Sequence, residues 1–442
     1  MSNNLMKLMG GSTIPIPDGW RATCAANFII ESMFGASIKP DDFRENGVEV
    51  IPKKAVTDKC IYALSDNDLA YVTEEFSLKS PRSVINGDCL ITSLRDLVPT
   101  GPSIGRCVKV WDAKKRVLAQ GVYGFKFNGD LDETLFAYIS NNDYFRRQVR
   151  AIMVGSTQIH ARANEYYSLP IILPPHNQQH KIAKILSTVD NLIEKTQALI
   201  DKYQSIKQGM MHDLFTRGVD GHGQLRPSYE DALHLYKESE LGWIPKEWEV
   251  CALEYKLDKI IDYRGKTPVK TESGLPLITA KNVRSGYIDE EPREYIAESS
   301  YDRWMTRGIP NVGDILFTTE APLGNVAKVP SYKMALAQRL LTLIPAEAEL
   351  TQDFLYWLLL WDGTFIRLEQ RSSGSTVLGI KQSVFRKMVF PFPPVEEQKI
   401  IAHSLNGVNR RVNSEQASLR KYSISKSGLM QDLLTGQVRV SV

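Results

Sequence analysis

The second half of the chain contains a cluster of basic side chains suited to binding phosphates and base edges. Between positions 264 and 284 the only acidic residue is Glu272, and glycine, threonine and asparagine separate the basic residues. Arginine and lysine bind phosphate oxygens and guanine, whereas asparagine and glutamine bind adenine. The candidate residues for contact with double-stranded DNA are Arg264, Lys266, Lys270, Lys281, Asn282 and Arg284, with Gln338 and Arg339 further along the chain.

Two Gly-Ser-Thr loops, at 155–157 and 374–376, carry further candidates. Their backbone and hydroxyl groups can donate hydrogen bonds to phosphates, and basic residues lie near each loop in the sequence. The candidates in the first half are Arg106, Lys109, Lys114, Lys115, Arg116, Ser156 and Thr157. Those in the second half are Arg371, Ser373, Ser375 and Lys381. A single surface charge is more often merely solvated, so the prediction concerns the patches.

Motifs for methyl transfer and nucleotide binding are incomplete. An adenine amino-methyltransferase needs Asn/Asp-Pro-Pro-Tyr/Phe, but Pro174-Pro175 and Pro393-Pro394 have neither the polar residue nor the aromatic. The segment 264–267, Arg-Gly-Lys-Thr, resembles the end of a phosphate-binding loop, yet Ile260 stands where that loop requires glycine. We therefore expect no ATP site here.

Metal and nuclease motifs are incomplete as well. His176 and His180 have helical spacing, but no glutamate follows His176 and the second half has Val395 and Lys399 at these positions. The segment 254–256, Glu-Tyr-Lys, lacks an upstream aspartate on a strand. These observations predict a chain that binds no metal and is not itself an enzyme.

A long internal repeat organises the chain. Residues 174–219 recur without a gap at 393–438, a constant offset of 219 residues. The segments before the two copies are more divergent, although both open with Ile-Pro-x-x-Trp, at 16–20 and 244–248. Ungapped self-similarity of this length indicates duplicated architecture.

Each copy of the repeat has the apolar spacing of a long amphipathic helix. The first seam is Ile182, Ile185, Val189, Leu192, Thr196, Leu199, Tyr203, Ile206 and Met210, and the second is Ile401, Leu405, Val408, Val412, Leu419, Tyr422, Leu429 and Leu433. The proline pairs start the helices and Gly218 lies just past the end of the first. We expect the two helices, of roughly 40 residues and ~60 Å each, to pack antiparallel.

The variable segments read as compact α/β domains. Short β-type runs occur at 275–279 and 314–319, and one helix is expected in each domain, near 135–145 and 354–367. The predicted fold class is therefore α+β, with two α/β domains separated by two long antiparallel helices, a coiled-coil spacer, and an internal pseudo-two-fold repeat.

The amino-acid composition does not show whether the chain binds a polyanion such as DNA. The 442 residues carry a formal net charge of only +3, so evidence for a polyanionic partner must come from local patches. The five cysteines form no Cys-x-x-Cys pair, which favours a reducing cytoplasm. The longest apolar run, at 354–361, is far shorter than the ~20 residues of a membrane span, so we expect a soluble cytoplasmic protein.

The ordered motifs resemble those of one known family. Each half opens with Ile-Pro-x-x-Trp, reaches Gly-Ser-Thr and continues into Pro-Pro-x-x-x-Gln-x-x-Ile-Ala. The segment 214–219, before the second half, reads Leu-Phe-Thr-Arg-Gly-Val. This twofold pattern, which covers essentially the whole chain, resembles the specificity (S) subunit of type I restriction-modification enzymes.

The resemblance implies a non-catalytic subunit that reads a bipartite asymmetric DNA site with two target recognition domains. It implies docking of modification (methyltransferase) subunits, two in number, and of restriction/translocase subunits, and these partners would use S-adenosylmethionine, ATP and Mg²⁺. We expect the repeated positions Gln179, Ile182, Gln398 and Ile401 to contribute to docking. The expected segments are a first recognition domain (1–173), a first helix (174–219), a connector (220–243), a second recognition domain (244–392) and a second helix with the C-terminal tail (393–442).

Two other interpretations remain open at this stage. The chain could be a stand-alone nuclease or methyltransferase with an unrecognised active site, in which case it would turn over substrate without partners. It could also be a coiled-coil scaffold that binds only proteins, in which case it would lack salt-dependent DNA affinity.

Overall fold

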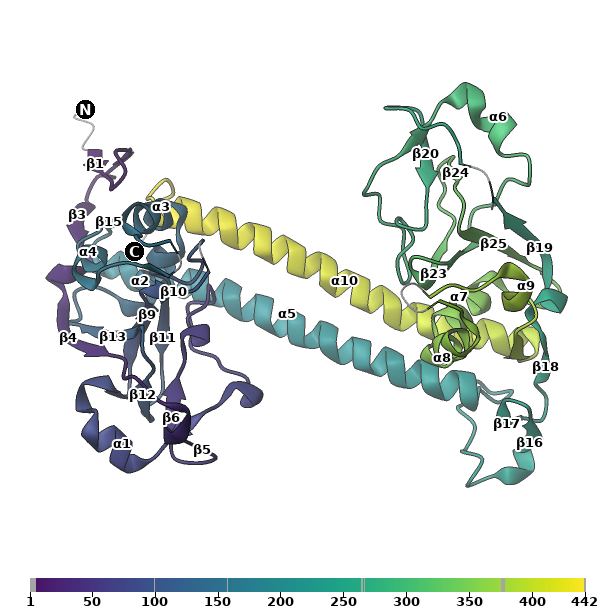
Figure 1. The fold of residues 1–442 in the computed structure, drawn as a ribbon, viewed down its shortest axis with the longest axis horizontal. Coiled ribbons are helices and arrows are strands. Elements are labelled where there is room, and N and C mark those ends of the chain that lie inside the picture. The colour runs from purple at the N-terminus through teal and green to yellow at the C-terminus, as the bar shows by residue number, and fades with distance from the viewer. Residues whose placement is uncertain are drawn as a thin grey trace. The chain divides into compact units, whose positions relative to one another are not determined.

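The computed structural model describes residues 5–98, 100–156, 158–263, 265, 267–374 and 378–440. These form two compact units, one of residues 1–198 and 416–442 and the other of residues 199–415 (Figure 1). Each unit thus contains one globular domain and part of both long helices, α5 (His176–Thr216) and α10 (Val395–Leu434). None of the helices described is long and apolar enough to cross a membrane.

The first domain precedes α5. Its helices are α1 (Glu74–Lys79), α2 (Glu133–Asn141), α3 (Asp143–Ile152) and α4 (Ala163–Tyr167). Its strands are β1 (Leu5–Lys7), β2 (Thr13–Pro15), β3 (Arg21–Cys24), β4 (Ile29–Phe34), β5 (Phe43–Arg44), β6 (Val48–Ile51), β7 (Tyr71–Val72), β8 (Val84–Asn86), β9 (Cys89–Ser93), β10 (Arg95–Asp96), β11 (Cys107–Val110), β12 (Lys115–Leu118), β13 (Val122–Phe127), β14 (Ile159–His160) and β15 (Pro170–Leu173).

The second domain lies between α5 and α10 in the sequence. Its helices are α6 (Tyr301–Trp304), α7 (Gln352–Leu360), α8 (Asp362–Arg371) and α9 (Gln382–Phe385). Its strands are β16 (Tyr236–Ser239), β17 (Gly242–Pro245), β18 (Glu249–Ala252), β19 (Leu257–Asp262), β20 (Leu275–Ile278), β21 (Tyr295–Ile296), β22 (Ile315–Thr319), β23 (Leu323–Lys328), β24 (Ala335–Leu336), β25 (Leu340–Pro345) and β26 (Val389–Phe392). The expected boundary between connector and domain, at 243/244, falls inside β17.

The two domains share one topology despite their divergent sequences. A four-stranded sheet has the order β11-β9-β13-β4 in the first domain and β23-β22-β25-β19 in the second. Beside it lies a parallel pair, β6 with β12 and β20 with β24. Parallel pairing of short strands needs a long crossover, so its occurrence in both domains indicates a common fold rather than chance.

The expected strands at 275–279 and 314–319 are confirmed as β20 and β22, but the single helix expected in each domain is wrong. Each region is a pair of helices, α2 with α3 and α7 with α8. The first pair breaks at Asn142, whose backbone is extended and whose side chain accepts a hydrogen bond from the Tyr144 N–H. The second breaks at Trp361, which is also extended. Asparagine at a helix N-cap satisfies a backbone N–H that would otherwise lack a partner.

The long antiparallel helices are confirmed. In the second unit the Tyr203 hydroxyl accepts a hydrogen bond from Arg411 at 3.5 Å, and Lys207 donates to Asn409 at 3.3 Å. In the first unit Ile182 and Leu186 share a core with Leu433. Residue numbers rise on one helix as they fall on the other, which is the antiparallel arrangement.

The apolar seam of α5 differs from the heptad expected at two positions. Leu192 and Ile206 are 42% and 40% exposed, whereas Ile200 is 3% exposed. A straight α-helix has 3.6 residues per turn and drifts away from a strict seven-residue repeat. The first turns of α5 pack on the domain with Leu186 and Ile182, so the buried face is not a simple coiled-coil seam along the whole helix.

One buried glutamine fixes the start of each long helix to its domain. Gln179 Oε1 accepts from the Asp132 N–H at 2.8 Å, and Gln398 Oε1 accepts from the Thr351 N–H at 2.9 Å. Both amide nitrogens donate to two backbone carbonyls. Asp132 and Thr351 are the N-cap residues of α2 and α7, so the same contact occurs twice.

This geometry corrects the predicted docking residues. Gln179 and Gln398 are 2% and 0% exposed, and Ile182 and Ile401 are 1% and 0% exposed. A side chain buried within its own unit has no surface to offer a partner. These four residues therefore have a structural role: they orient each helix on its domain.

A buried ion pair lies at the start of α10, and the described residues at the start of α5 have none. Glu397 binds Arg226 by two hydrogen bonds and accepts others from Trp248 Nε1 at 3.1 Å and the Val219 N–H at 2.9 Å. Arg226 and Glu397 are each 7% exposed. This cluster ties the connector to the first turn of α10. The equivalent position in α5 is Gln178, which is half-buried.

Replacing Glu397 by alanine should strongly destabilise the second unit. Arg226 would remain buried without its partner, and breaking a buried pair in this way costs about 3–5 kcal/mol. We expect the unfolding temperature of that unit to fall by about 10 °C in calorimetry. Gln178→Ala is the matched control and should change it little; equal effects of the two substitutions would contradict this role of Glu397.

Candidate nucleic-acid interface

The parallel strands β20 and β24 end at a surface groove of the second domain with a cavity of ≈ 270 Å³. The carboxyl ends of parallel strands are a common place for ligands, because the chain leaves the sheet there in loops. The polar residues lining this groove are Thr267, Lys270, Thr279, Lys281, Glu294, Gln338 and Arg339. We call it the second-domain groove. It gathers four of the residues predicted from sequence: Lys270, Lys281, Gln338 and Arg339.

The basic side chains of this groove are held loosely. Lys270 pairs with Glu294 at 2.8 Å, and Arg339 lies 3.9 Å from Glu320 at the groove edge. Gln338 Nε2 donates to Thr267 Oγ1 at 3.4 Å. Lys281 is exposed and forms no ion pair within the described chain. Exposed pairs of this kind contribute little stability, so these cations are available to an incoming anion.

The described residues on either side of the second Gly-Ser-Thr motif, Ser373 and Gly379, adjoin the groove edge. Ser373 and Gly379 exchange both backbone hydrogen bonds, and the Ile380 N–H donates to the Thr319 carbonyl at 2.9 Å. Gly379 also pairs with Glu320, the neighbour of Arg339. Ser373, Arg371 and Lys381 are all exposed along this segment. Ser375, like Arg264 and Lys266, lies outside the described residues.

Two predicted residues of the second domain have other roles. Asn282 is 2% exposed, accepts hydrogen bonds from the N–H and hydroxyl of Thr279, and donates to the carbonyls of Asp289 and Pro292. Its amide is fully used in holding the turn after β20, so the prediction that it contacts DNA is wrong. Arg284 is half-buried and pairs with Asp289 at 3.2 Å.

Two predicted residues of the first domain are internal. Lys109 is 4% exposed and forms an ion pair with Glu133. Arg116 is 2% exposed and binds Glu49 at 2.8 Å and Asp112. Burial lowers the pKa of Arg116, but the hydrogen bonds to Asp112 and Glu49 outweigh burial and hold that pKa above its usual value. The prediction of DNA contact by Lys109 and Arg116 is therefore wrong.

The remaining first-domain candidates are dispersed. Arg106 donates to Asn141 and to the Pro102 carbonyl, and Lys115 pairs with Glu74. Lys114 and Ser156 are exposed. Lys114 and Lys115 lie at the amino end of β12. The surface that matches the second-domain groove lies at the other, carboxyl end of this strand. Thr157 lies outside the described residues.

Hydrogen bonds identify the equivalent surface of the first domain. The Ala119 N–H donates to the Ile51 carbonyl at 3.0 Å, as the Ala337 N–H does to the Ile278 carbonyl at 2.9 Å. The carboxyl ends of β6 and β12 therefore match those of β20 and β24. The exposed or half-buried polar residues at this matching position are Lys53, Lys54, Arg95 and Gln120. The name first-domain groove denotes these four residues, by analogy with the second domain.

The sequence analysis missed these four residues. The signal was Leu118-Ala119-Gln120, which repeats as Leu336-Ala337-Gln338. Aligned on these triplets, Gln120 matches Gln338. The basic residues Lys114, Lys115 and Arg116 cluster at the amino end of β12, so basic composition favoured that end of the strand over the carboxyl end.

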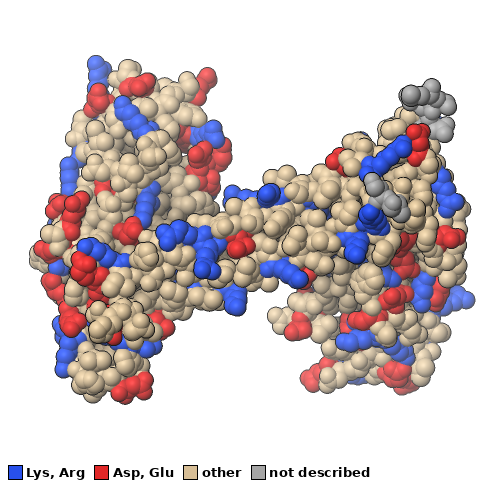
Figure 2. All heavy atoms as spheres, turned by 180° about the vertical axis from the view of Figure 1, so that it is seen from behind, with Lys and Arg blue, Asp and Glu red and all other residues tan. Residues whose placement is uncertain are grey.

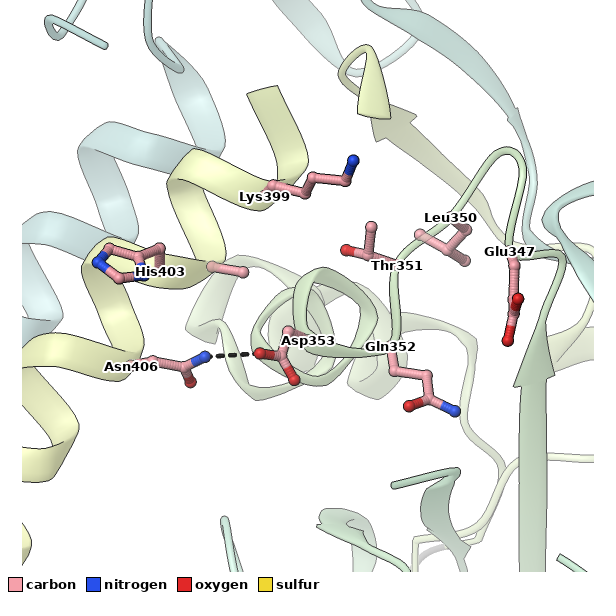
Figure 3. A pocket seen from close by; sticks show the side chains of 9 residues that line it. Glu347, Leu350, Thr351, Gln352, Asp353, Lys399, His403 and Asn406 are labelled. Carbon is pink, nitrogen blue, oxygen red and sulfur yellow. Dashed lines mark hydrogen bonds between the residues drawn. The ribbon is translucent and has the colours of Figure 1, made fainter. Parts of the chain in front are cut away.

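A larger cavity, of ≈ 460 Å³, lies where α7 meets α10 in the second unit (Figure 3). Lys399, His403 and Asn406 reach it from one face of α10, and Asn406 Nδ2 donates to Asp353 at 2.6 Å. Burial raises the pKa of Asp353, but its ion pair with Lys328 and the hydrogen bond from Asn406 outweigh burial and lower that pKa. A carboxylate held ionised by two partners is poorly suited to acid-base catalysis.

Neither the distribution of surface charge nor the placement of possible metal ligands indicates a further binding site among the described residues. Figure 2 shows acidic and basic side chains interspersed over each domain on the face drawn, without one continuous basic area. Among the described residues, no group of three or more His, Cys, Asp or Glu side chains is placed to hold a metal ion. The two grooves are thus distinguished by position and partners rather than by net charge.

Comparison with known proteins identifies the family. The profile of the "Type I restriction modification DNA specificity domain" matches residues 35–202 and again 245–421. The MjaVIII type I restriction enzyme specificity subunit of Methanocaldococcus jannaschii is 26% identical over 75% of this chain and 76% of its own length. The putative MjaX specificity subunit of the same organism is 29% identical over 70% and 65%, respectively.

A solved structure has the same fold. The S subunit of a type I restriction-modification system from M. genitalium aligns over 99% of this chain and 100% of its own, with a TM-score of 0.60 and 14% identity. Together with the two profile matches, this fold agrees with the duplicated domains and helices described above. The chain belongs to the family of type I restriction-modification DNA specificity subunits, which are not themselves catalytic.

Proposed function

We propose that this specificity subunit reads two half-sites in DNA, one with the first-domain groove and one with the second-domain groove. The observation that carries the proposal is the recurrence of the parallel strand pair and of the glutamine that follows its second strand. In both domains the carboxyl ends of a parallel strand pair open onto a surface with basic residues and a glutamine, Gln120 or Gln338. Because the remaining side chains differ, the two half-sites differ in sequence and the full site is asymmetric.

Within each groove the lysines and the other polar residues have separate tasks. Lys281 in the second domain, and Lys53 and Lys54 in the first, supply charge for phosphate oxygens, which fixes register without reading sequence. Gln338 and Arg339 have the planar donor and acceptor groups needed for base edges. Arg371, Ser373 and Lys381 extend the phosphate contacts along the loop beside the second-domain groove.

Assembly with partner subunits follows from the family. We infer that two methyltransferase subunits and restriction subunits bind this chain, and that S-adenosylmethionine, ATP and Mg²⁺ are used by them. The sequence of this chain has neither the Asn/Asp-Pro-Pro-Tyr/Phe motif nor a complete phosphate-binding loop. For docking, the exposed face of α10 with Lys399 and His403 is available, whereas Gln398 and Ile401 beneath it are not.

Replacing Lys281 by alanine should weaken binding to all DNA sequences by a similar factor. Loss of one phosphate contact should reduce the slope of log affinity against log salt by about one. Titration of the full chain with duplex DNA at several salt concentrations measures this slope, and calorimetry should show an unchanged unfolding temperature because the side chain is exposed.

Lys109→Ala is the matched control in the first domain. Lys109, like Lys281, is a lysine, but it is buried against Glu133, so its loss should lower the unfolding temperature and leave the salt slope unchanged. If Lys109→Ala reduced the slope and Lys281→Ala did not, the assignment of DNA contact to the grooves would be wrong.

We propose that the lengths of α5 and α10 set the number of base pairs between the half-sites. Inserting seven residues after Ala198 and seven after Glu415 keeps the phase of the apolar seam and adds ~10 Å of helix. At 3.4 Å per base pair, the preferred gap should grow by about three base pairs. Methylome sequencing of cells carrying the variant reads out the gap; an unchanged gap would exclude this role of the helices.

A further inference from the structure

The backbone of the second-domain groove adopts an unfavourable conformation at Arg339. Its φ is +71°, in the left-handed region that residues with a Cβ atom seldom occupy. Three non-glycine residues in the described chain have positive φ, and two of them, Ala321 and Arg339, line this one groove. Such residues persist where the surrounding structure holds them, and they concentrate at ligand sites.

The first domain has a glycine at the same place. The Leu94 N–H donates to the Gly121 carbonyl at 3.2 Å, as the Thr319 N–H does to the Arg339 carbonyl at 3.1 Å. Gly121 has φ of +89°, which glycine adopts without strain. The fold thus needs a left-handed residue here but does not need arginine. Arginine at this position lowers local stability and is explained by its side chain.

The neighbouring position also differs in charge between the domains. Arg95 pairs with His160 across two short strands, and Glu320 pairs with Gly379 in the same way. The following residues match too, because Ala161 binds Leu94 as Ile380 binds Thr319. Arg95 therefore corresponds to Glu320. At these two positions the first domain has Gly121 and Arg95, and the second domain has Arg339 and Glu320.

Glu320 positions the Arg339 side chain without fully occupying it. Arg339 Nη2 lies 3.9 Å from Glu320 Oε1, and the two side chains are 51% and 45% exposed. At this distance the carboxylate attracts the guanidinium but makes no hydrogen bond to it. The guanidinium has five N–H donors, and none of them donates a hydrogen bond to another of the described residues, so they can serve an incoming acceptor.

We propose that Arg339 reads a guanine in the second half-site, with Glu320 as its positioning residue, and that the first domain makes no such contact because Gly121 takes its place. The inference rests on the proposed function of the second-domain groove. Arginine is the side chain whose fork of donors matches guanine O6 and N7 in the major groove. No other base offers two acceptors to that fork.

The test compares the full chain, with its partner subunits, before and after Arg339→Gly. The probe is a pool of duplex oligonucleotides with a randomised core, from which bound sequences are selected and read. We expect Arg339→Gly to lose roughly 5- to 150-fold of its preference for guanine at one position of the second half-site. Preferences at the other positions should remain, and the unfolding temperature should be unchanged or higher because the strain is removed.

Three further variants separate recognition of guanine from the effect of charge. Arg339→Lys keeps the positive charge but not the fork, so it should retain affinity and lose most of the guanine preference. Arg303→Ala removes an exposed arginine of the same domain that does not line the groove, and it should change neither. Glu320→Gln should weaken the guanine preference without changing the salt slope.

The outcomes distinguish this inference from the proposed function. If Arg339→Gly selects the same sequences as the unaltered chain while Lys281→Ala still weakens binding, the groove binds DNA and the role of Arg339 is wrong. If neither variant alters affinity or selection, the groove is not the DNA surface and both proposals fail. Loss of preference in the first half-site would also overturn the assignment.

Discussion

Two buried glutamine amides fix how each long helix leaves its domain. Gln179 and Gln398 each satisfy the N–H of the residue that caps the helix after the four-stranded sheet, and they bind two further carbonyls. A buried amide with all its partners is costly to disturb, because any shift leaves several polar groups unpaired. The grooves and the helix of a unit are therefore parts of one rigid frame, and a side chain in the groove has a defined place relative to that helix.

The two domains share the same backbone structure around the groove position and differ in the side chains that it carries. Both have the parallel pair, the left-handed residue that follows the glutamine, and an antiparallel backbone bridge, between Val154 and His160 or between Ser373 and Gly379. The conserved features are hydrogen bonds between backbone groups, which tolerate almost any side chain. The side chains that project from them, Arg95 against Glu320 and Gly121 against Arg339, are free to vary. Such a division lets sequence preference change while the fold remains.

Much of the architecture could be predicted from the sequence because it depends on period and repetition. The seam from Ile182 and the copy at Ile401 identified both helices, and the Pro-Pro pairs located their starts. The groove was only half found. The fold brings Lys270, Lys281, Gln338 and Arg339 together in this groove. Of the other predicted residues, Lys109 and Arg116 are buried with acidic partners distant in sequence, and Asn282 is buried in a local turn. Composition alone does not show that Glu133 and Glu49 neutralise those cations, since the pairing is made by the fold.

The net charge of +3 also acquires a physical meaning from the structure. Many cations are paired with acids in the domain interiors or on their surfaces, so long-range attraction to DNA is weak and much of the affinity must arise at short range. Short-range binding depends on which side chains are free and where they point. Arg339, held in place beside Glu320, therefore contributes more to sequence preference than a further lysine on the surface would. At Arg339 the second domain has a strained backbone where the first domain has the unstrained Gly121. Local stability is therefore lower at the position that serves recognition.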